Sequence, residues 1–294
     1  MYRIGIDFGG TKLESIILDA SGVEVFRKRI PTEAAVGYDH ILNNIASLYR
    51  ETTAHIDNAP HTCGVGIPGA CSTHTGRVKN SNTTCTIGRP LKDDLECLLK
   101  RSVGIENDAN CFAIAEASYG AGRGHPVVFG AILGTGCGGG IVINKVLWSG
   151  HMAIAGEWGH MSIDPMGADC YCGQKGCVET YVSGGGMQKR YALEHGESLA
   201  FHQIAEQYFT KEPHAVAFIQ EFLQAFGRSL ANLIAVLDPD IIVLGGGVSN
   251  FEPLYSEGIQ EVRRHVFSDV LDTPIVRNTL GDSAGVIGAA LIGL

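Results

Sequence analysis

The sequence predicts an α/β protein of two lobes with a cleft between them. Apolar runs of strand length alternate with amphipathic patterns of helical period, which is the order expected of an α/β fold. A strand, a glycine turn containing Thr and a second strand open the chain at residues 4–18, and a similar pattern recurs at 129–144. This recurrence suggests a duplicated unit. A chain of 294 residues also has the length of two ordinary lobes.

The first lobe is predicted to cover residues 1–119. Apolar spacing and the Gly and Pro stops predict its elements in a simple order. The expected order is strands 2–8, 13–18 and 24–30, helix 38–53, strand 63–67, helix 91–99, strand 103–106 and helix 109–119.

The second lobe is predicted to cover residues 120–282 and to follow a glycine-rich joint at 120–124. The same patterns predict strands at 127–133 and 140–144 and a loop-rich stretch from Gly150 to about Gly186. The remaining elements are expected to be helices 198–208 and 213–237, strand 241–244, helix 253–266 and a final helix at 283–294.

Composition and charge exclude several classes of protein. The chain is 45% hydrophobic and 18% charged, which is typical of a globular protein. Its formal charge of −9 argues against nucleic acid or an anionic membrane surface as the main partner. No apolar run approaches the roughly 20 residues that cross a bilayer, and the first residues do not form a secretory signal. We therefore expect a cytoplasmic protein without nucleic-acid or membrane partners.

The first glycine turn is a candidate phosphate-binding turn. Asp7, Gly9, Gly10, Thr11 and Lys12 follow the first strand directly. Adjacent glycines let a backbone approach an anion closely, Thr11 and Lys12 can add a hydroxyl and a charge, and Asp7 could hold a hydrated Mg²⁺. The alternative is an ordinary Gly-Gly hairpin with an exposed Asp.

Two further glycine turns follow apolar strands. Residues 133–140 contain five glycines, and Gly134, Thr135 and Gly136 form the second turn. Gly245, Gly246 and Gly247 form the third turn, which could lie against an adenine ring or be a simple turn. The spacing fits neither a P-loop nor a dinucleotide fingerprint. The second turn in particular has more glycines than a hairpin needs, which favours phosphate binding.

The cysteines indicate a reducing compartment and a metal site. Six of the nine stand alone, whereas Cys170, Cys172 and Cys177 lie close together and follow His160. Three thiolates and an imidazole without a carboxylate are typical of a closed, tetrahedral structural Zn²⁺. The alternative is a loop of reduced cysteines.

Three carboxylates could serve an enzyme. Glu157 and Glu179 flank the metal cluster and could accept hydrogen bonds from vicinal hydroxyls, although they could also be exposed loop residues. Asp108 lies between a strand and a helix, beside Asn107. It could cap the helix, or it could accept the proton of an attacking hydroxyl while Asn107 orients the substrate.

Together these motifs closely resemble the ROK family of bacterial sugar kinases. The resemblance covers residues 2 to about 290 and is most specific in the CxCGxxGCxE and ExGH elements. The motifs, in chain order, are DFGGTK at 7–12, GIPG at 66–69, NDAN at 107–110, LGTGCGGG at 133–140, EWGH at 157–160, CYCGQKGCVE at 170–179 and DPDIIVLGGG at 238–247.

The resemblance implies an actin-like ATPase (ribonuclease H-like) fold, ATP as the phosphoryl donor and usually a homodimer. It implies that helix 283–294 returns to the first lobe and that Asp108 is the catalytic base. The sugar ligands that the resemblance implies are Asn107, Glu157, His160 and Glu179, and it places Pro68, Gly69 and Asn82 beside the sugar. The nucleotide contacts that it implies are Gly10, Thr11, Lys12, Thr135 and Gly246.

Within the family, VKNSNTT at 78–84 and GDSAGV at 281–286 favour the fructokinase/mannokinase branch. We therefore expect transfer to a free hexose, at the C6 hydroxyl. Kinases of N-acetylglucosamine or N-acetylmannosamine are the alternative. A non-catalytic, sugar-sensing regulator is a remote alternative, because such repressors carry a DNA-binding helix-turn-helix ahead of a kinase-like body, and this chain begins its first strand at residue 2.

Overall fold

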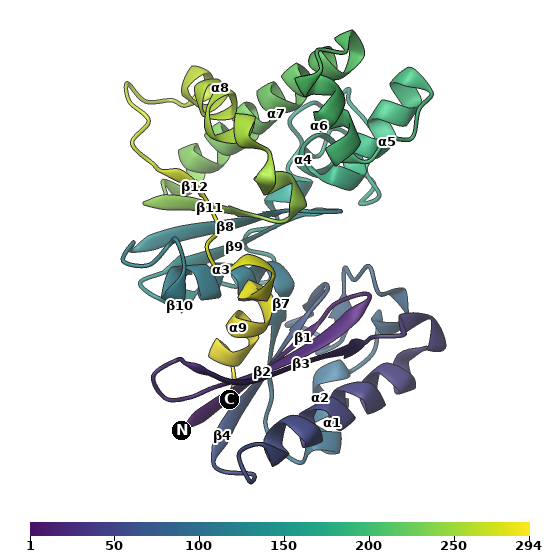
Figure 1. Ribbon diagram of the computed structural model, residues 1–294, viewed down its shortest axis with the longest axis vertical. Helices are drawn as coiled ribbons and strands as arrows, with labels where there is room; N and C mark the ends of the chain where they lie inside the picture. Colours follow the sequence, from purple (N-terminus) through teal and green to yellow (C-terminus); the bar gives the residue numbers. More distant parts are fainter. The chain divides into compact units, whose positions relative to one another are not determined.

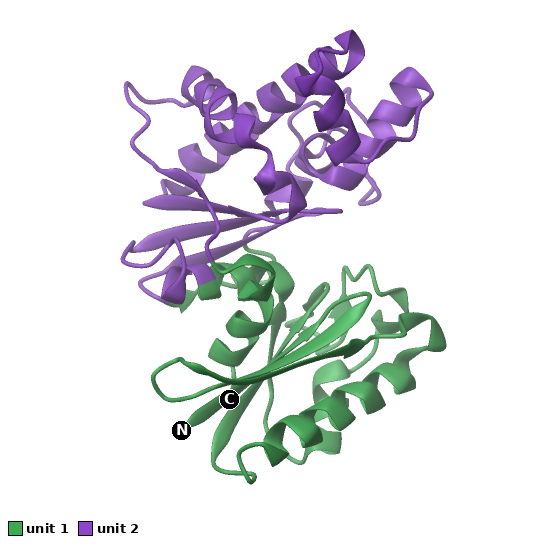
Figure 2. Cartoon of the chain, viewed as in Figure 1, with its two compact units in different colours: residues 1–115, 146–155, 280–294 green, residues 116–145, 156–279 purple.

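The computed structural model describes residues 1–294, which divide into two compact units (Figure 2). Unit 1 comprises Met1–Ala115, Val146–Ala155 and Leu280–Leu294, and unit 2 comprises Glu116–Lys145 and Gly156–Thr279. The predicted lobes differ from these units in one notable segment, because the sequence assigned residues 146–155 to the second lobe whereas the structure groups them with unit 1.

Unit 1 is built on a five-stranded sheet with the order β3-β2-β1-β4-β7 (Figure 1). The first three strands are antiparallel neighbours, and the last two run parallel to β1. The strands are β1 (Tyr2–Phe8), β2 (Lys12–Leu18), β3 (Glu24–Pro31), β4 (His61–Ile67) and β7 (Gly104–Asn107). A small two-stranded sheet of β5 (Ala70–Cys71) and β6 (Val78–Lys79) follows β4.

Helices cover both faces of this sheet. On one face, α1 (Tyr38–Ala54) and α2 (Leu91–Leu99) bury their apolar sides against β1, β2 and β4. On the other face lies α9 (Ala284–Leu291), which brings the end of the chain back onto β1 and β4 (Figure 1). Helix α3 (Asp108–Tyr119) starts directly at the end of β7. Short 3₁₀ turns complete the unit at Ala34–Val36, Thr84–Thr86 and Gly281–Ser283.

A row of glycines seats α9 on the sheet. Gly5, Gly64 and Gly104 are neighbours across β1, β4 and β7. A Cβ at Gly5 would overlap Val286 O, and one at Gly64 would overlap Ala289 O. The backbone of α9 therefore rests directly on the backbone of the sheet, an approach that only glycine permits.

Unit 2 repeats the same sheet order, β10-β9-β8-β11-β12. When the five strands of each sheet are counted in chain order, both sheets have the order third, second, first, fourth and fifth, which supports the predicted duplication. The strands are β8 (Val127–Leu133), β9 (Cys137–Ile143), β10 (Val146–Leu147), β11 (Ile241–Gly245) and β12 (Ile275–Arg277). Strand β10 pairs in this sheet although it begins the segment 146–155, which is grouped with unit 1.

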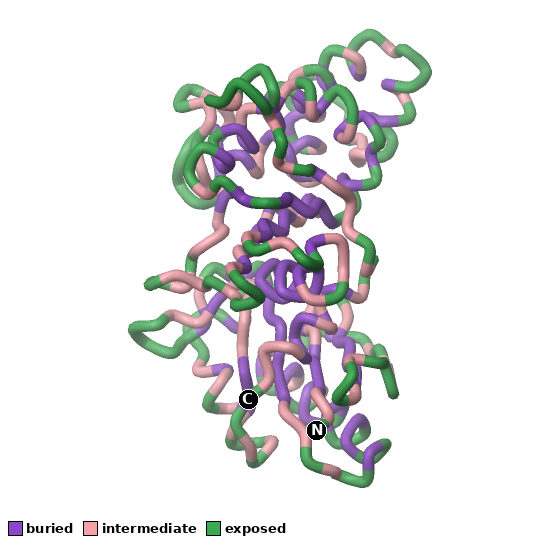
Figure 3. The backbone as a smooth tube through the Cα atoms, turned by 90° about the vertical axis from the view of Figure 1, so that its left-hand side faces the viewer, coloured by how far each residue is buried: buried purple, intermediate pink, exposed green.

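The helices of unit 2 pack around the long helix α7, whose Phe218, Phe222 and Phe226 lie in the core. The helices are α4 (Val178–Val182), α5 (Gly184–His195), α6 (Phe201–Phe209), α7 (Pro213–Leu237) and α8 (Glu257–His265), with 3₁₀ turns at Trp158–His160, Gly247–Asn250 and Glu252–Tyr255. Buried residues follow the strands and the inner sides of the helices (Figure 3). None of the helices is long and apolar enough to span a membrane.

Three sequence predictions about local structure were wrong. The stretch up to Gly186 was expected to be loop, but α5 begins at Gly184, capped by the Ser183 hydroxyl, which accepts a hydrogen bond from Gly186 N at 2.9 Å. The strand expected at 140–144 begins at Cys137 instead. The helix expected at 253–266 is interrupted at Ser256, whose φ of −121° and ψ of −78° are not helical.

We predict that Gly64→Ala destabilises the protein by about 3 kcal/mol, because the new methyl group must displace α9. The matched control is Gly76→Ala, at a positive φ of 67° with no atom within 4 Å of an added Cβ, and we expect it to cost about 1 kcal/mol. Urea denaturation of the two variants measures the difference. Equal losses would contradict the docking of α9 on the glycine row.

Candidate active site

The β1–β2 turn is held in shape from β3. Gly9 N donates to Lys12 O at 3.0 Å and closes the turn. The Thr32 hydroxyl donates to Gly9 O at 2.6 Å, and Thr32 N donates to Thr11 O at 3.0 Å. Thr32 is buried, whereas Gly10 and Thr11 are exposed at the tip of the turn. The tip is therefore free to contact a ligand although its base is fixed.

Asp7, the last residue but one of β1, is half-buried and has an unusually high pKa. Burial raises the pKa of Asp7 to about 7, the charges of Asp108 and Glu14 raise it further, and Lys12 and Arg29 oppose them. Gly285 of α9 lies so close that a Cβ there would be 3.3 Å from Asp7 Oδ2. The influence of Asp108 means that two predicted site carboxylates lie close enough to repel each other, and a bound cation would relieve that repulsion.

Asn107 and Asp108 occupy the junction of β7 and α3. Asn107 Nδ2 donates to Gly69 O at 3.0 Å, which ties the loop of Pro68 and Gly69 to the end of β7. Ala109 N donates both to Asn107 Oδ1 at 2.9 Å and to Asp108 Oδ1 at 2.8 Å. Asn107 thus provides the capping contact from outside the helix, and Asp108, the first residue of α3, keeps an exposed side chain.

Asn82 lies in a segment that packs against this loop. It is exposed between Ser81 and Thr83, which are both buried. A Cβ at Gly69, whose φ is +93°, would be 2.9 Å from Ser81 Cα, so the two predicted segments do pack together. The structure brings Pro68, Gly69 and Asn107 together and places Asn82 at their margin.

The predicted nucleotide residues of unit 2 converge on the β8–β9 turn. Gly184 N donates to Gly134 O at 2.7 Å, and Gly185 N donates to Thr135 O at 3.1 Å, so the first turn of α5 rests on this turn. A Cβ at Gly246 would be 2.5 Å from Leu133 O. The second and third glycine turns and the beginning of α5 therefore form one surface of exposed backbone.

A pocket of about 440 Å³ opens at this surface. The predicted residues that line it are Gly134, Thr135 and Gly247. Sequence reasoning missed its other residues, although the Ser183 cap and the following glycines were a signal for the beginning of α5. The missed residues are Gly184, Gly185, Gln188, Ala200, Phe201, His202 and Val248.

Not all glycines of residues 133–140 serve this turn. Gly138, Gly139 and Gly140 belong to strand β9. A Cβ at Gly139 would be 2.6 Å from the Phe129 ring and 2.8 Å from Trp158 Cδ1. The high glycine count of this run thus has two causes, because Gly134 and Gly136 lie in the turn whereas Gly139 makes room for Trp158 of the EWGH element.

The structure brings the four donor atoms of the predicted metal cluster together. The ligand atoms of His160, Cys170, Cys172 and Cys177 all lie within 4.8 Å of one another. His160 Nδ1 is 3.7 Å from Cys170 Sγ, and Cys172 Sγ is 3.6 Å from Cys177 Sγ. A zinc ion bound at roughly 2.0–2.3 Å holds its ligand atoms roughly 3.3–3.8 Å apart, so the donor set and its spacing fit Zn²⁺.

Backbone turns bring these donors together. Cys170 N donates to Gln174 O at 2.9 Å, and Gly173 N donates to Cys170 O at 3.0 Å. Gly176 has a φ of +64°, and a Cβ there would overlap Asp164 O. His160 Nε2, the ring nitrogen that faces away from the thiols, lies 3.1 Å from the Tyr171 hydroxyl.

Glu157 and Glu179 lie near each other and near the β8–β9 turn. Cys137 N donates to Glu179 Oε2 at 2.8 Å. Burial raises the pKa of the Cys137 thiol, and the charges of Glu179 and Glu157 raise it further. Burial also raises the pKa of Tyr171 to about 12, again with contributions from Glu179 and Glu157. The two carboxylates thus share one region beside the metal cluster.

Curated relatives resemble this chain over its whole length. An N-acetyl-D-glucosamine kinase of Yersinia pseudotuberculosis is 38% identical over 99% of this chain and 98% of its own. A protein of the same name from Pectobacterium atrosepticum is also 38% identical, and one from Haemophilus influenzae is 36% identical over 98% of each chain.

Solved structures of ROK proteins also match this chain over its whole length. A ROK hexokinase from Thermus thermophilus matches with a TM-score of 0.91 at 27% identity, over 100% of this chain and 98% of its own. A ROK family glucokinase from Streptomyces griseus, solved with glucose and AMPPNP, matches with a TM-score of 0.80 at 29% identity, over 100% and 99% of the two chains. These matches confirm the predicted α/β, actin-like ATPase fold. Because the ROK family model also matches residues 3–293, the chain belongs to the ROK family.

Proposed function

We propose that this protein is an ATP-dependent N-acetyl-D-glucosamine kinase that transfers the γ-phosphoryl group to a sugar hydroxyl, expected at C6. At the coarser level the chain is a sugar kinase of the ROK family, a phosphotransferase with an alcohol acceptor. One observation carries the choice of sugar. Full-length relatives at 36–38% identity are named N-acetyl-D-glucosamine kinases, whereas the hexokinase and glucokinase structures are 27% and 29% identical.

This proposal changes the preference reached from the sequence. The motifs favoured a fructose, mannose or glucose kinase, but the relatives support the N-acetylhexosamine alternative better. A putative N-acetylmannosamine kinase from Listeria monocytogenes has a TM-score of 0.84 at 27% identity, which keeps N-acetylmannosamine as the second candidate. A ROK transcriptional regulator is 23% identical and is a likeness of fold alone.

The proposed chemistry assigns the base to Asp108. Its exposed carboxylate is held by Ala109 N at the start of α3, one residue after Asn107. A carboxylate in that position can accept the proton of the attacking hydroxyl, and phosphoryl transfer needs little more from the protein than positioning and charge neutralisation. Asn107, Pro68, Gly69, Asn82, Glu157, His160 and Glu179 are the proposed sugar contacts.

The glycine turns are the proposed nucleotide contacts. Backbone N–H groups of these turns can bind phosphate oxygens where they are not already donated within the protein. The N–H groups of Gly9, Gly134, Gly184 and Gly185 donate to backbone carbonyls and hold the turns in shape. The proposed set is Gly9, Gly10, Thr11, Lys12, Gly134, Thr135, Gly136, Gly245, Gly246 and Gly247, extended by Gly184 and Gly185 of α5. Asp7 is the proposed carboxylate for a hydrated Mg²⁺, which would neutralise the phosphate charge. A homodimer and a cytoplasmic location remain predictions.

A coupled ADP-release assay across six sugars tests the proposed substrate. We expect N-acetylglucosamine to give the highest kcat/KM among N-acetylglucosamine, N-acetylmannosamine, glucose, mannose, fructose and allose. A preference for N-acetylmannosamine would support the second candidate. A preference for an unmodified hexose would return the assignment to the branch that the sequence motifs favoured.

We expect Asp108→Asn to lower kcat by about 10²- to 10⁴-fold, because the amide cannot accept the hydroxyl proton. The dissociation constant for the sugar, measured by calorimetry, should change little. Asp57→Asn is the matched control, since Asp57 is exposed at a positive φ of 48°, where Asn is well tolerated. Full activity of Asp108→Asn would overturn its assignment as the base.

Zinc removal should lower the melting temperature by several degrees and raise the KM for the sugar, because Glu157 and Glu179 flank the four donors. Elemental analysis of freshly purified protein should find one zinc per chain. Cys172→Ser should lose the ion, whereas the control Cys97→Ser, at an exposed lone cysteine, should keep it. Protein purified without stoichiometric zinc would contradict the structural metal site.

A further inference from the structure

Residues 146–155 are grouped with unit 1, although the chain before residue 146 and after residue 155 belongs to unit 2. Residues 148–155, here called the strap, follow β10 and lead directly into Gly156 and Glu157. The Ser149 hydroxyl donates to Glu106 Oε1 at 2.7 Å. Lys79 Nζ donates to Met152 O at 2.9 Å, and the Thr73 hydroxyl donates to His151 O at 3.4 Å.

The strap has a conformation that it does not favour by itself. Ala153 has a φ of +51°, a backbone region that is disfavoured for any residue with a Cβ. Trp148, Met152 and Ile154 are exposed, so apolar burial contributes little to holding the strap in place. Such conformations persist only where surrounding contacts maintain them. The three side-chain hydrogen bonds between the strap and the rest of unit 1 are contacts that can maintain this conformation.

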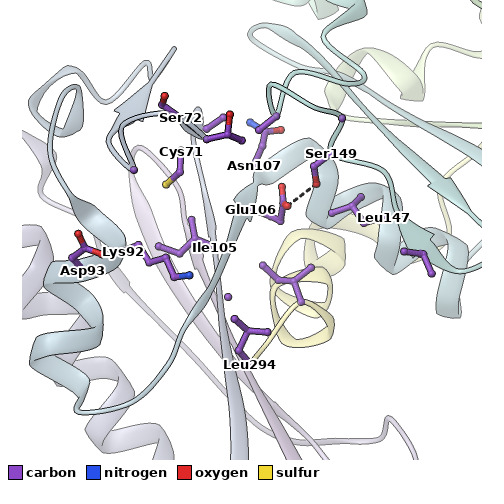
Figure 4. A pocket seen from close by; sticks show the side chains of 18 residues that line it. Cys71, Ser72, Lys92, Asp93, Ile105, Glu106, Asn107, Leu147, Ser149 and Leu294 are labelled. Atoms are coloured by element: carbon purple, nitrogen blue, oxygen red, sulfur yellow. Dashed lines mark hydrogen bonds between the residues drawn. The ribbon is translucent and has the colours of Figure 1, made fainter.

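Glu106 connects the strap with the proposed base. It lies in β7 directly before Asn107, the last residue of that strand, and its Oε2 accepts from Asn110 Nδ2 at 2.9 Å in the first turn of α3. One carboxylate therefore joins the strap to the strand and the helix between which Asp108 lies. Figure 4 shows Glu106 and Ser149 facing each other at the edge of a cavity of about 570 Å³, lined by residues of unit 1 such as Ile105 and Leu294.

We propose that Ser149 and Glu106 are a positioning pair for sugar recognition. Their hydrogen bond fixes the strap, and the strap fixes the start of the segment that carries Glu157 and His160, two of the proposed sugar contacts. Asn107, on the other side of Glu106, is a third. The pair therefore acts on Glu157 and His160 through the chain that follows the strap, and on Asn107 as its neighbour in sequence. This inference rests on the proposed function, because it assumes that these residues bind the sugar.

The experiment compares Ser149→Ala with Ser149→Thr, which retains the hydroxyl. We expect Ser149→Ala to raise the KM for N-acetylglucosamine about tenfold, the effect of losing one hydrogen bond to a charged group, with the KM for MgATP within about twofold of the wild-type value. Ser149→Thr should restore most of the affinity. The control is Ser72→Ala. Ser72 lines the same cavity, but its hydroxyl accepts from His74 N and Thr75 N within its own turn, so we expect no change in either KM.

A double-mutant cycle tests the pairing. If Ser149 acts through Glu106, the variant that combines Ser149→Ala with Glu106→Ala should bind the sugar no more weakly than Glu106→Ala alone. Additive losses would show that Ser149 acts by another route and would overturn the pair. A fall in melting temperature with both KM values unchanged would assign the pair a structural role alone, which also contradicts the proposal.

Fluorescence gives a readout that does not need turnover. The chain has two tryptophans, and Trp148 beside Ser149 is 57% exposed whereas Trp158 is 3% exposed. Release of the strap by Ser149→Ala should increase iodide quenching of Trp148, and Ser149→Thr should not. If N-acetylglucosamine is not the substrate, the kinetic comparison is made with the sugar that the assay identifies, and the quenching result stands by itself. Unchanged quenching in Ser149→Ala would overturn the inference.

Discussion

Backbone packed directly on backbone, at positions where a side chain would not fit, is the contact on which both units depend. In unit 1 it seats α9 on Gly5 and Gly64, and in unit 2 it seats the first turn of α5 and Gly246 against the β8–β9 turn. Such contacts have almost no freedom to adjust, because peptide groups are rigid and no flexible side chain lies between them. The turns proposed to bind phosphate are therefore held in shape before any nucleotide arrives.

The second feature of the molecule is the concentration of negative charge beside those turns. Asp7 is half-buried near Asp108, and Glu14 lies fully buried below them with Arg27 at 2.7 Å and Arg29 at 2.8 Å. A site of this kind is unfavourable when empty of cations, since burial and like charges both oppose ionisation of Asp7. The same arrangement would become favourable with a magnesium ion beside Asp7, because one cation attracts both the carboxylates and the phosphates. An overall charge of −9 is thus compatible with local binding of a polyanion.

The proposed control of sugar binding lies outside the motifs that resemble the family. The EWGH element and the cysteine cluster belong to the motifs that resemble the family, whereas the strap at residues 148–155 lies between those motifs. A hydroxyl on Ser149 and a carboxylate on Glu106 meet at 2.7 Å. The motifs favoured hexoses while full-length relatives favour N-acetylglucosamine, which is understandable if contacts outside the motifs adjust the position of shared sugar ligands.

The sequence by itself determined the family, the α/β fold, the strand-turn-strand duplication and the members of the metal cluster. Each of these depends on local order, on residue type or on short spacing, which a linear sequence displays. Only the tertiary structure decided which glycines face a ligand: Gly134 lines a pocket, whereas Gly139 makes room for Trp158. It also placed α5 against the phosphate turn and residues 146–155 with unit 1. These outcomes depend on contacts between segments far apart in sequence, where tertiary packing overrides local preference.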